Sequence, residues 1–217
     1  MFNHKFLEKE ELPSTTNEDG RIYHSPVGDL RSVTTILGDN QDKEWLKEWQ
    51  KAVGKEESDR ESKMATRHGS TIHNLIESYL MNAYSTPLMP THKITMKKVM
   101  PLLDAHIHHI LGIEFPLWSE KLRTAGRVDL ISDWDHVLAI VDFKTSKNQL
   151  SMEEVIERGY FLQTTAYSLM LEERLGLRAQ KNVIINIPEF EDPTFFIQYR
   201  GKYIPEVIRI FTGEKND

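Results

Sequence analysis

Two apolar runs joined by a short polar turn constrain the fold of this chain most strongly. Residues 126–131 and 137–144 are rich in β-branched and aliphatic side chains, and the polar residues 133–136 lie between them. This pattern is typical of two neighbouring buried strands connected by a tight turn. It predicts a hairpin at the centre of a sheet.

Charged side chains interrupt the second run. Asp142 and Lys144 are two residues apart, so the alternation of strand side chains directs both to the same face. A buried carboxylate or ammonium is costly without a partner. Asp129, on the first run, is a natural companion to Asp142, and two close carboxylates repel each other unless a divalent cation binds them. An ordinary ion pair at a strand edge explains Asp142 and Lys144 alone, but explains less once Asp129 is added.

The bulk properties limit the classes of protein that need to be considered. The chain has 217 residues and a net charge of −6, and it contains no cysteine. The lack of cysteine excludes disulfides, zinc–thiolate sites and an iron–sulfur cluster. No apolar run approaches the ~20 residues of a membrane span, and the N-terminus lacks an apolar signal core. We expect a cytoplasmic protein with a flexible N-terminal arm at 1–19 and a single domain at 20–217.

The remaining periodicities indicate an α/β fold in which helices flank a mixed central sheet of about five strands. Beyond the hairpin, we expect strands at 115–122, 182–188 and 194–199, with a further short strand at 21–24. We expect helices at 42–54, 56–83, 94–111, 151–175 and 204–211, and a capped helical turn at 32–38. Gly69 marks a point where the second of these helices could be interrupted, and Pro101 should kink or split the third.

Several short motifs, taken together, resemble a known family. Asp129 followed by Asp142-Phe-Lys144 is similar to the signature of PD-(D/E)XK nucleases. The order in which four motifs occur resembles the RecB-type branch: Gly69-x-x-x-His73, Gly126-Arg-Val-Asp129, Asp142-Phe-Lys144 and Gln163-x-x-x-Tyr167. Within that branch, residues 32–37 upstream of a tryptophan-bearing helix resemble the mitochondrial genome maintenance exonuclease group and its phage relatives. The similarity covers roughly residues 20–200. Val128 stands where the family often has proline.

The resemblance implies a restriction-endonuclease-like core, with the N-terminal helical region arching over the site. It implies that His73, Asp129, Asp142 and the Phe143 carbonyl hold Mg²⁺ or Mn²⁺, hard cations that prefer oxygen ligands. An imidazole among carboxylates would favour Mn²⁺ over Mg²⁺. Lys144 would orient or help deprotonate the attacking water and stabilise charge on the phosphate.

Other polar residues are candidates for substrate contact. By the same resemblance, Gln163 and Tyr167 would contact the DNA backbone and support the site, although simple helix packing also explains their spacing. Thr145 and Ser146, which follow the catalytic lysine, could bind a phosphate. Arg127 lies on the hairpin and could help to bind DNA, or it could belong to a solvated face.

Two glutamates each allow two assignments. Glu120, on the strand expected before the hairpin, could add a carboxylate to the catalytic group, or could form a salt bridge with Arg123 or Arg127. Glu77 lies one helical turn after His73 and shares its face, so it is either a supporting base or a surface charge.

The favoured function is a metal-dependent DNA exonuclease that hydrolyses phosphodiester bonds from the ends of single-stranded DNA. Its expected setting is DNA replication, recombination or repair in a bacterium or a phage-infected host, with replication or recombination proteins as possible partners. One alternative is a structure-specific or flap endonuclease. Another is a catalytically silent DNA-binding module, against which the intact set of Asp129, Asp142 and Lys144 argues.

Overall fold

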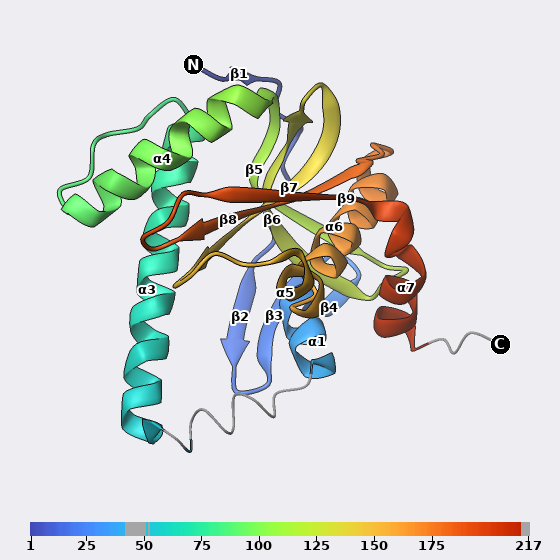
Figure 1. Ribbon diagram of the computed structural model, residues 1–217. Helices are drawn as coiled ribbons and strands as arrows, with labels where there is room; N and C mark the ends of the chain where they lie inside the picture. Colours follow the sequence, from blue (N-terminus) through green and yellow to red (C-terminus); the bar gives the residue numbers. More distant parts are fainter. Residues whose placement is uncertain (42–50, 52, 214–217) are drawn as a thin grey trace.

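The computed structural model describes residues 1–41, 51 and 53–213, and Figure 1 shows one sheet between two groups of helices. The strands are β1 (Asn3–His4), β2 (Ser14–Asn17), β3 (Gly20–Ser25), β4 (Gly28–Ser32), β5 (Ile107–Ser119), β6 (Thr124–Trp134), β7 (Val137–Ser146), β8 (Lys181–Pro188) and β9 (Thr194–Tyr199). The helices are α1 (Val33–Asn40), α3 (Lys55–Leu80), α4 (Pro90–His106), α5 (Met152–Glu157), α6 (Tyr160–Leu175) and α7 (Ile204–Thr212), with a 3₁₀ turn at Arg200–Lys202.

The mixed α/β class and the flanking helices are as predicted, but the sheet is larger than the expected five strands. The described residues form nine strands in the order β2-β3-β4-β6-β7-β8-β9, with β5 paired to β6 and to β1. The additional strands are short and come from the N-terminal region. β2, for example, is Ser-Thr-Thr-Asn with every residue exposed, so it lacks the apolar alternation by which a strand is recognised in a sequence.

Two predicted helix boundaries are wrong. The helix expected at 94–111 is α4, which ends at His106, and residues 107–111 begin β5 instead. The helix expected at 151–175 is divided into α5 and α6 by Gly159, whose φ of 69° is left-handed. Such a residue cannot continue a right-handed helix. In contrast, α3 continues through Gly69 without a break.

Part of the predicted N-terminal organisation lies outside the described residues. This applies to most of the helix expected at 42–54. Residues 1–19, expected as a flexible arm, carry β1 and β2, and Leu12 is buried with 3% of its surface exposed. The N-terminal region is therefore not purely helical, since four of its elements are strands. The division into an arm and a single domain stays a prediction.

A separate hydrophobic core fills each face of the sheet. On one face, α3 and α4 pack against β7 and β8 through Ile72, Ile76, Leu80, Met96, Val99, Leu103, Val141, Phe143, Val183 and Ile185. On the other face, α1, α6 and α7 pack through Val33, Leu37, Ala166, Met170, Leu171, Val207 and Phe211. Because both faces are covered, a polar side chain inside the sheet needs partners from the layers above or below.

The central strand β6 has two different partners along one edge. Its first residues pair in parallel with β4, through Arg31↔Thr124 and Ser32↔Ala125. Its last residues pair antiparallel with β7, from Leu130↔Val141 onward. Among the described residues, 126–129 belong to neither ladder, while β7 continues alongside β8 to Ser146. The edge of β6 therefore has a gap between β4 and β7 that ends at Asp129, and we call this point the fork of the sheet. The polar residues of the second run lie at this fork.

Candidate active site

Asp129 links the two strands at the fork. The N–H of Phe143 donates to Asp129 Oδ2 at 2.9 Å, so the side chain takes the place of a main-chain acceptor where the ladder ends. Continuing the register one step beyond Leu130↔Val141 sets Asp129 opposite Asp142. The two carboxylates are therefore neighbours across the strands, as the hairpin pattern predicts.

Asp142 is held by groups from α6 and from its own strand. Only 2% of its surface is exposed. Gln163 Nε2 donates to Asp142 Oδ1 at 2.7 Å, and Lys144 Nζ donates to Gln163 Oε1 at 3.0 Å. Asp142 Oδ2 lies 2.7 Å from Lys144 Nζ, and the two groups form an ion pair. Gln163 thus bridges the carboxylate and the ammonium and fixes their relative positions.

His73 comes from α3, which covers the face of the sheet opposite to the one covered by α6. It is half-buried beside Ile72, one of the residues that α3 buries, and its Nδ1 lies 3.6 Å from Asp129 Oδ2. One turn earlier, a Cβ on Gly69 would lie 3.0 Å from Thr145 Oγ1. A glycine at this position therefore lets α3 come close to the end of β7, as predicted.

Glu114 is a member of this group that the sequence did not single out. It lies between Ile113 and Phe115, whose partners Leu130 and Val128 flank Asp129. Its φ of 44° is left-handed, and register shifts precede it in β5. Residues other than glycine rarely adopt this conformation, and such backbone strain tends to occur at functional sites. Glu114 interrupts an apolar strand just as Asp142 does, and this signal could have identified it.

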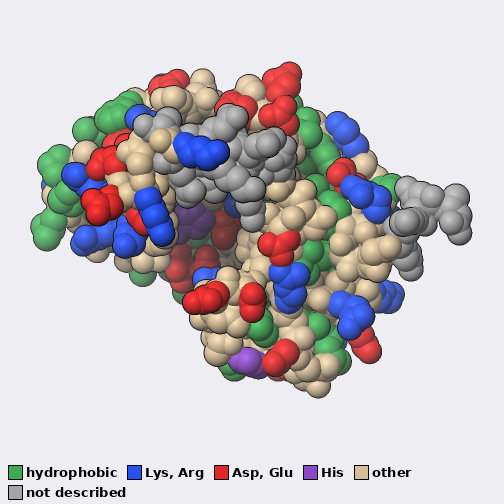
Figure 2. Space-filling model, turned by 90° about the horizontal axis from the view of Figure 1, so that it is seen from below, with side chains coloured by type: hydrophobic (Ala, Val, Ile, Leu, Met, Phe, Trp, Pro, Cys, Tyr) green, Lys and Arg blue, Asp and Glu red, His purple; other side chains and the backbone are tan. Residues whose placement is uncertain are grey.

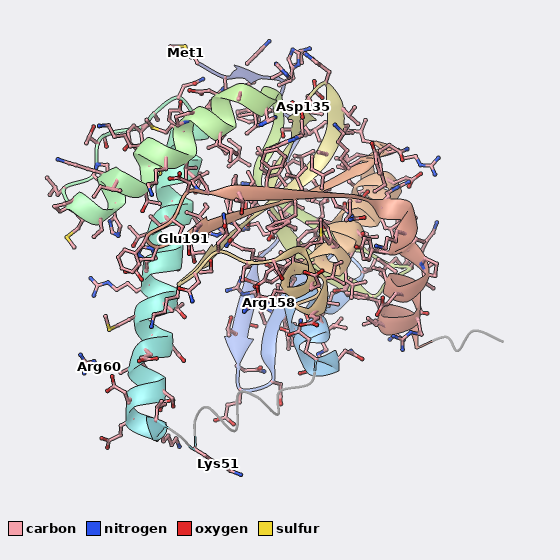
Figure 3. The ribbon with its side chains drawn as sticks, viewed as in Figure 1. Met1, Lys51, Arg60, Asp135, Arg158 and Glu191 are labelled. Atoms are coloured by element: carbon pink, nitrogen blue, oxygen red, sulfur yellow. The ribbon has the colours of Figure 1, made fainter. Side chains whose placement is uncertain are left out.

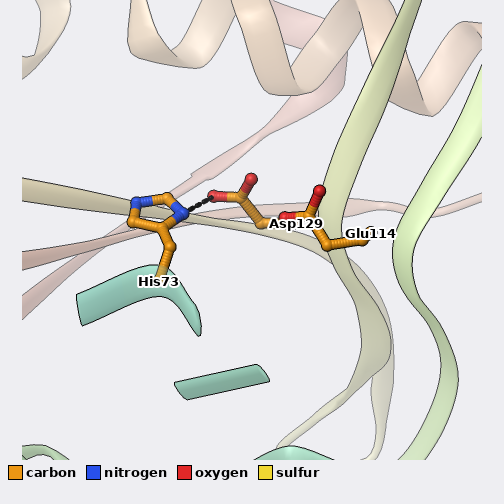
Figure 4. A group of neighbouring side chains, drawn as sticks. All are labelled: His73, Glu114 and Asp129. Atoms are coloured by element: carbon orange, nitrogen blue, oxygen red, sulfur yellow. Dashed lines mark ion pairs between the residues drawn. The ribbon is translucent and has the colours of Figure 1, made fainter. Parts of the chain in front are cut away.

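His73, Glu114 and Asp129 converge although they come from α3, β5 and β6 (Figure 4). One ligand atom from each lies within 4.8 Å of the others. A cavity of about 10 Å³ lies against all three, together with Glu77, Leu80, Ile113 and Phe143. This volume is close to the minimum that holds one water molecule, so the cavity is suited to a single small occupant. The face shown in Figure 2 has a recess in which acidic and histidine side chains gather.

Burial and like charges shift the ionisation of these groups. Burial raises the pKa of Asp129 well above its ordinary value, and the neighbouring Asp142 raises it further. Burial, and then Glu77, raise the pKa of Glu114. Burial lowers the pKa of His73, which favours the neutral ring that can donate a lone pair. Burial alone would lower the pKa of Lys144, but Asp142 and Asp129 outweigh it, so that the pKa is raised.

These observations fit a divalent cation. One imidazole nitrogen and two carboxylate oxygens form a mixed set of the kind that transition metals such as Mn²⁺ accept. A positive ion would also offset the repulsion that raises the pKa values of Asp129 and Glu114. In this structure the oxygens of Asp142 face Gln163 and Lys144. The ligand roles of Asp142 and of the Phe143 carbonyl therefore stay predictions.

Comparison with known families agrees with this geometry. The sequence profile of the PD-(D/E)XK nuclease superfamily matches residues 4–199, which is most of the chain. The chain therefore belongs to the PD-(D/E)XK nuclease superfamily. Comparison with curated proteins gives no match.

Two solved structures are distantly similar to the nuclease. One is the crystal structure of a proposed exonuclease from Eubacterium rectale, with 12% identity and a TM-score of 0.42, covering 67% of this chain and 68% of the other. The second, SSO0001, has 12% identity and a TM-score of 0.30, covering 70% of this chain and 72% of the other. At such scores neither structure assigns roles to individual residues of the nuclease.

The structure corrects the placement of Glu120. This residue is exposed in the turn after β5, and its N–H donates to Glu173 Oε1 at 3.0 Å. Glu114 lies six positions earlier in the chain, and a rise of roughly 3.3 Å per strand residue sets the two glutamates about 20 Å apart. The prediction failed because β5 starts at Ile107 and ends at Ser119, so the carboxylate that reaches Asp129 comes from the middle of the strand.

The structure also corrects the predicted role of Tyr167 in contacting DNA. Only 3% of its surface is exposed, and its ring packs among the residues between α6 and the sheet. Burial raises the pKa of Tyr167 and the nearby Gln163 side chain opposes this shift, so the tyrosine lies beside the bridge between Asp142 and Lys144 and supports it from within the core. Gln163, 8% exposed, likewise supports the site, and both ends of its amide are engaged there.

The remaining candidates lie around the fork. Arg127 on β6 is near enough to Glu114 to lower its pKa, opposing the burial. Ser146 donates to Asn148 O at 2.6 Å and accepts from Asn186 Nδ2 at 2.7 Å, so its hydroxyl is already used in shaping the end of β7. Thr145 lies against Gly69, and Glu77 is exposed at the margin of the small cavity. Substrate contact by Arg127, Thr145 and Ser146 stays a prediction.

No helix in the described part of the chain is both long enough and apolar enough to span a membrane.

Proposed function

We propose that this nuclease is a divalent-metal-dependent deoxyribonuclease that removes nucleotides from the ends of single-stranded DNA. The observation that carries the proposal is the convergence of His73, Glu114 and Asp129 beside the Asp142–Lys144 pair. A set of metal ligands next to a fixed ammonium is an arrangement suited to phosphodiester hydrolysis.

Mg²⁺ or Mn²⁺ would be held by His73, Glu114 and Asp129, with Asp142 as the further predicted ligand. When bound, such a cation supplies Lewis acidity toward the phosphate and lowers the pKa of water. The nitrogen ligand favours Mn²⁺. We therefore expect activity with both cations and tighter binding of Mn²⁺.

Side chains beside the metal site would stabilise the developing charge and keep the reacting groups in position. The Lys144 ammonium, fixed by Asp142 and Gln163, brings a positive charge to the fork, where it can stabilise charge that develops on a phosphate. Gln163 keeps the lysine at a constant position because it bonds to both groups. Tyr167 and the strand pairing of β7 with β8 keep this assembly rigid.

Two features of the shape support action on a strand with a free end. The recess in Figure 2 carries acidic and histidine side chains within it, and α3 extends past the sheet beside the same face in Figure 1. We infer that the substrate enters through this recess beside α3, where a single flexible strand fits better than a stiff duplex. The family resemblance, which implies an arch over the site, points in the same direction.

Linear and circular single-stranded DNA of the same sequence, incubated with Mn²⁺, test the proposal. We expect degradation of the linear substrate only, and no activity in Asp142→Asn. Cleavage of the circle would contradict the exonuclease assignment and favour an endonuclease. If neither substrate is cut while Asp142→Asn binds DNA as the unaltered protein does, a silent DNA-binding module is the better assignment.

The proposed setting is DNA replication, recombination or repair in the cytoplasm of a bacterium or a phage-infected cell, and proteins of those processes are the proposed partners. This part rests on the family resemblance.

A further inference from the structure

The Lys144 ammonium has an aromatic neighbour in addition to its two polar partners. Nζ lies 4.7 Å from the centroid of the Tyr160 ring. A cation within about 6 Å of an aromatic face is attracted by the ring's quadrupole, and the attraction strengthens when water is excluded. Lys144 is only 20% exposed, so this contact is shielded from solvent.

Tyr160 and Gln163 act on Lys144 from the same helix. Tyr160 is the first residue of α6, directly after the left-handed Gly159, and Gln163 follows one turn later on the same side. Arg158, labelled in Figure 3, ends α5 two residues before Tyr160 in the chain. The start of α6 therefore presents a ring and an amide to one ammonium.

The ring itself is held by packing. Tyr160 is half-buried and packs against a cluster of buried side chains that includes Leu150, Phe161, Ile184 and Tyr203. Ile184 belongs to β8 and pairs in register with Asp142. The ring is thus supported by the strand that neighbours the catalytic one, so it can act as a fixed wall.

We propose that Tyr160 is a positioning residue for Lys144: its ring closes one side of the ammonium and confines it to the side that faces the phosphate. The proposal rests on the proposed nuclease function. Asp142 and Gln163 supply the charge and the hydrogen bond, and Tyr160 excludes water and the alternative rotamers of the lysine. The aromatic ring is the required part of the side chain, and the hydroxyl is not.

A role for Tyr160 in binding DNA would have a different kinetic signature. The residue also lines a groove of about 860 Å³ that runs between α1, α5 and α7, with Gln41, Arg158 and Arg209 among its other walls. If Tyr160 bound the DNA strand there, its loss would raise KM and leave kcat unchanged. A positioning role predicts the opposite, because the lysine acts in the transition state.

The experiment compares Tyr160→Phe and Tyr160→Leu with the unaltered protein, using linear single-stranded DNA and Mn²⁺. Tyr199→Leu is the control, since Tyr199 is 62% exposed at the end of β9. We expect Tyr160→Leu to lower kcat by roughly three- to thirtyfold with KM unchanged, as the strength of such a contact implies. Tyr160→Phe and Tyr199→Leu should retain full kcat.

Three outcomes would overturn the proposal: a rise in KM alone, an unchanged kcat in Tyr160→Leu, or an equal loss of kcat in Tyr160→Phe. If Tyr160→Leu does not fold, the Phe variant alone still decides whether the ring is sufficient. Lack of cleavage by the unaltered protein would contradict the proposed function, and so the two failures are distinguishable.

Discussion

The ring of Tyr167 packs so closely against Gly126 that no other residue fits there. A Cβ on Gly126 would lie 2.6 Å from Tyr167 Cε1 and 2.8 Å from its Oη. Real side chains do not approach this closely, so any larger residue must displace the ring. Because Tyr167 lies one helical turn after Gln163 on α6 and close to its side chain, the displacement would reach the bridge between Asp142 and Lys144.

We therefore predict that Gly126→Ala impairs catalysis although it touches no reacting group. A shift of the bridge by an ångström can cost on the order of a hundredfold in rate, and overpacking should cost ~1–3 kcal/mol of stability. The measurements are kcat on linear single-stranded DNA and the free energy of unfolding in urea. Gly38→Ala is the matched control, since nothing lies within 4 Å of a Cβ there and Gly38 is inside a helix. Full activity in Gly126→Ala would show that the ring can move without affecting the site.

A pair of glutamate variants separates the observed site from the one predicted from the sequence. Glu114→Gln should weaken Mn²⁺ binding by at least about tenfold, because it removes a charged ligand. Glu120→Gln should bind Mn²⁺ as the unaltered protein does, since Glu120 lies in an exposed turn. Isothermal titration calorimetry measures both. Weakened binding in Glu120→Gln with normal binding in Glu114→Gln would reverse our assignment.

An ion pair away from the fork, between the buried Arg200 and the partly exposed Glu172, allows stability to be separated from function. Arg200, 2% exposed, donates to Glu172 Oε2 and, at 3.1 Å, to Ser168 Oγ. Arg200→Met removes these hydrogen bonds but leaves Glu172 40% exposed, where water can solvate it, so we expect a loss of about 1.5–3 kcal/mol, the range for hydrogen bonds to charged groups. Urea unfolding should show this loss, while the Mn²⁺ affinity at 10 °C stays unchanged. A parallel loss of metal affinity would show that the packing around Arg200 is coupled to the metal site.

Much of the site followed from local pattern. Asp129, Asp142 and Lys144 stand out because charged groups are costly in apolar strands. The alternation of side chains places Asp142 and Lys144 on one face, and the hairpin pattern places Asp129 on the neighbouring strand. Ser32 was recognisable as a helix cap, and its side chain does accept from the Thr35 N–H.

Other features depend on contacts that no local pattern contains. Glu114 points toward Asp129 because its own backbone is left-handed and β5 is irregular just before it. Residues 107–111 were assigned to a helix, and this assignment hid the start of β5. The close packing of Tyr167 on Gly126 joins residues far apart in the chain. The N-terminal strands are short, and β1 and β4 depend on the edges that β5 and β6 offer for pairing.

The central claim is that His73, Glu114 and Asp129 share one cation beside Lys144. Anomalous diffraction from a crystal grown with Mn²⁺ tests it most directly, because the peak reports the position of the metal itself. We predict a peak in contact with His73 Nδ1 and with carboxylate oxygens of Glu114 and Asp129. A peak bound elsewhere, or none at these three residues at saturating Mn²⁺, would contradict the account.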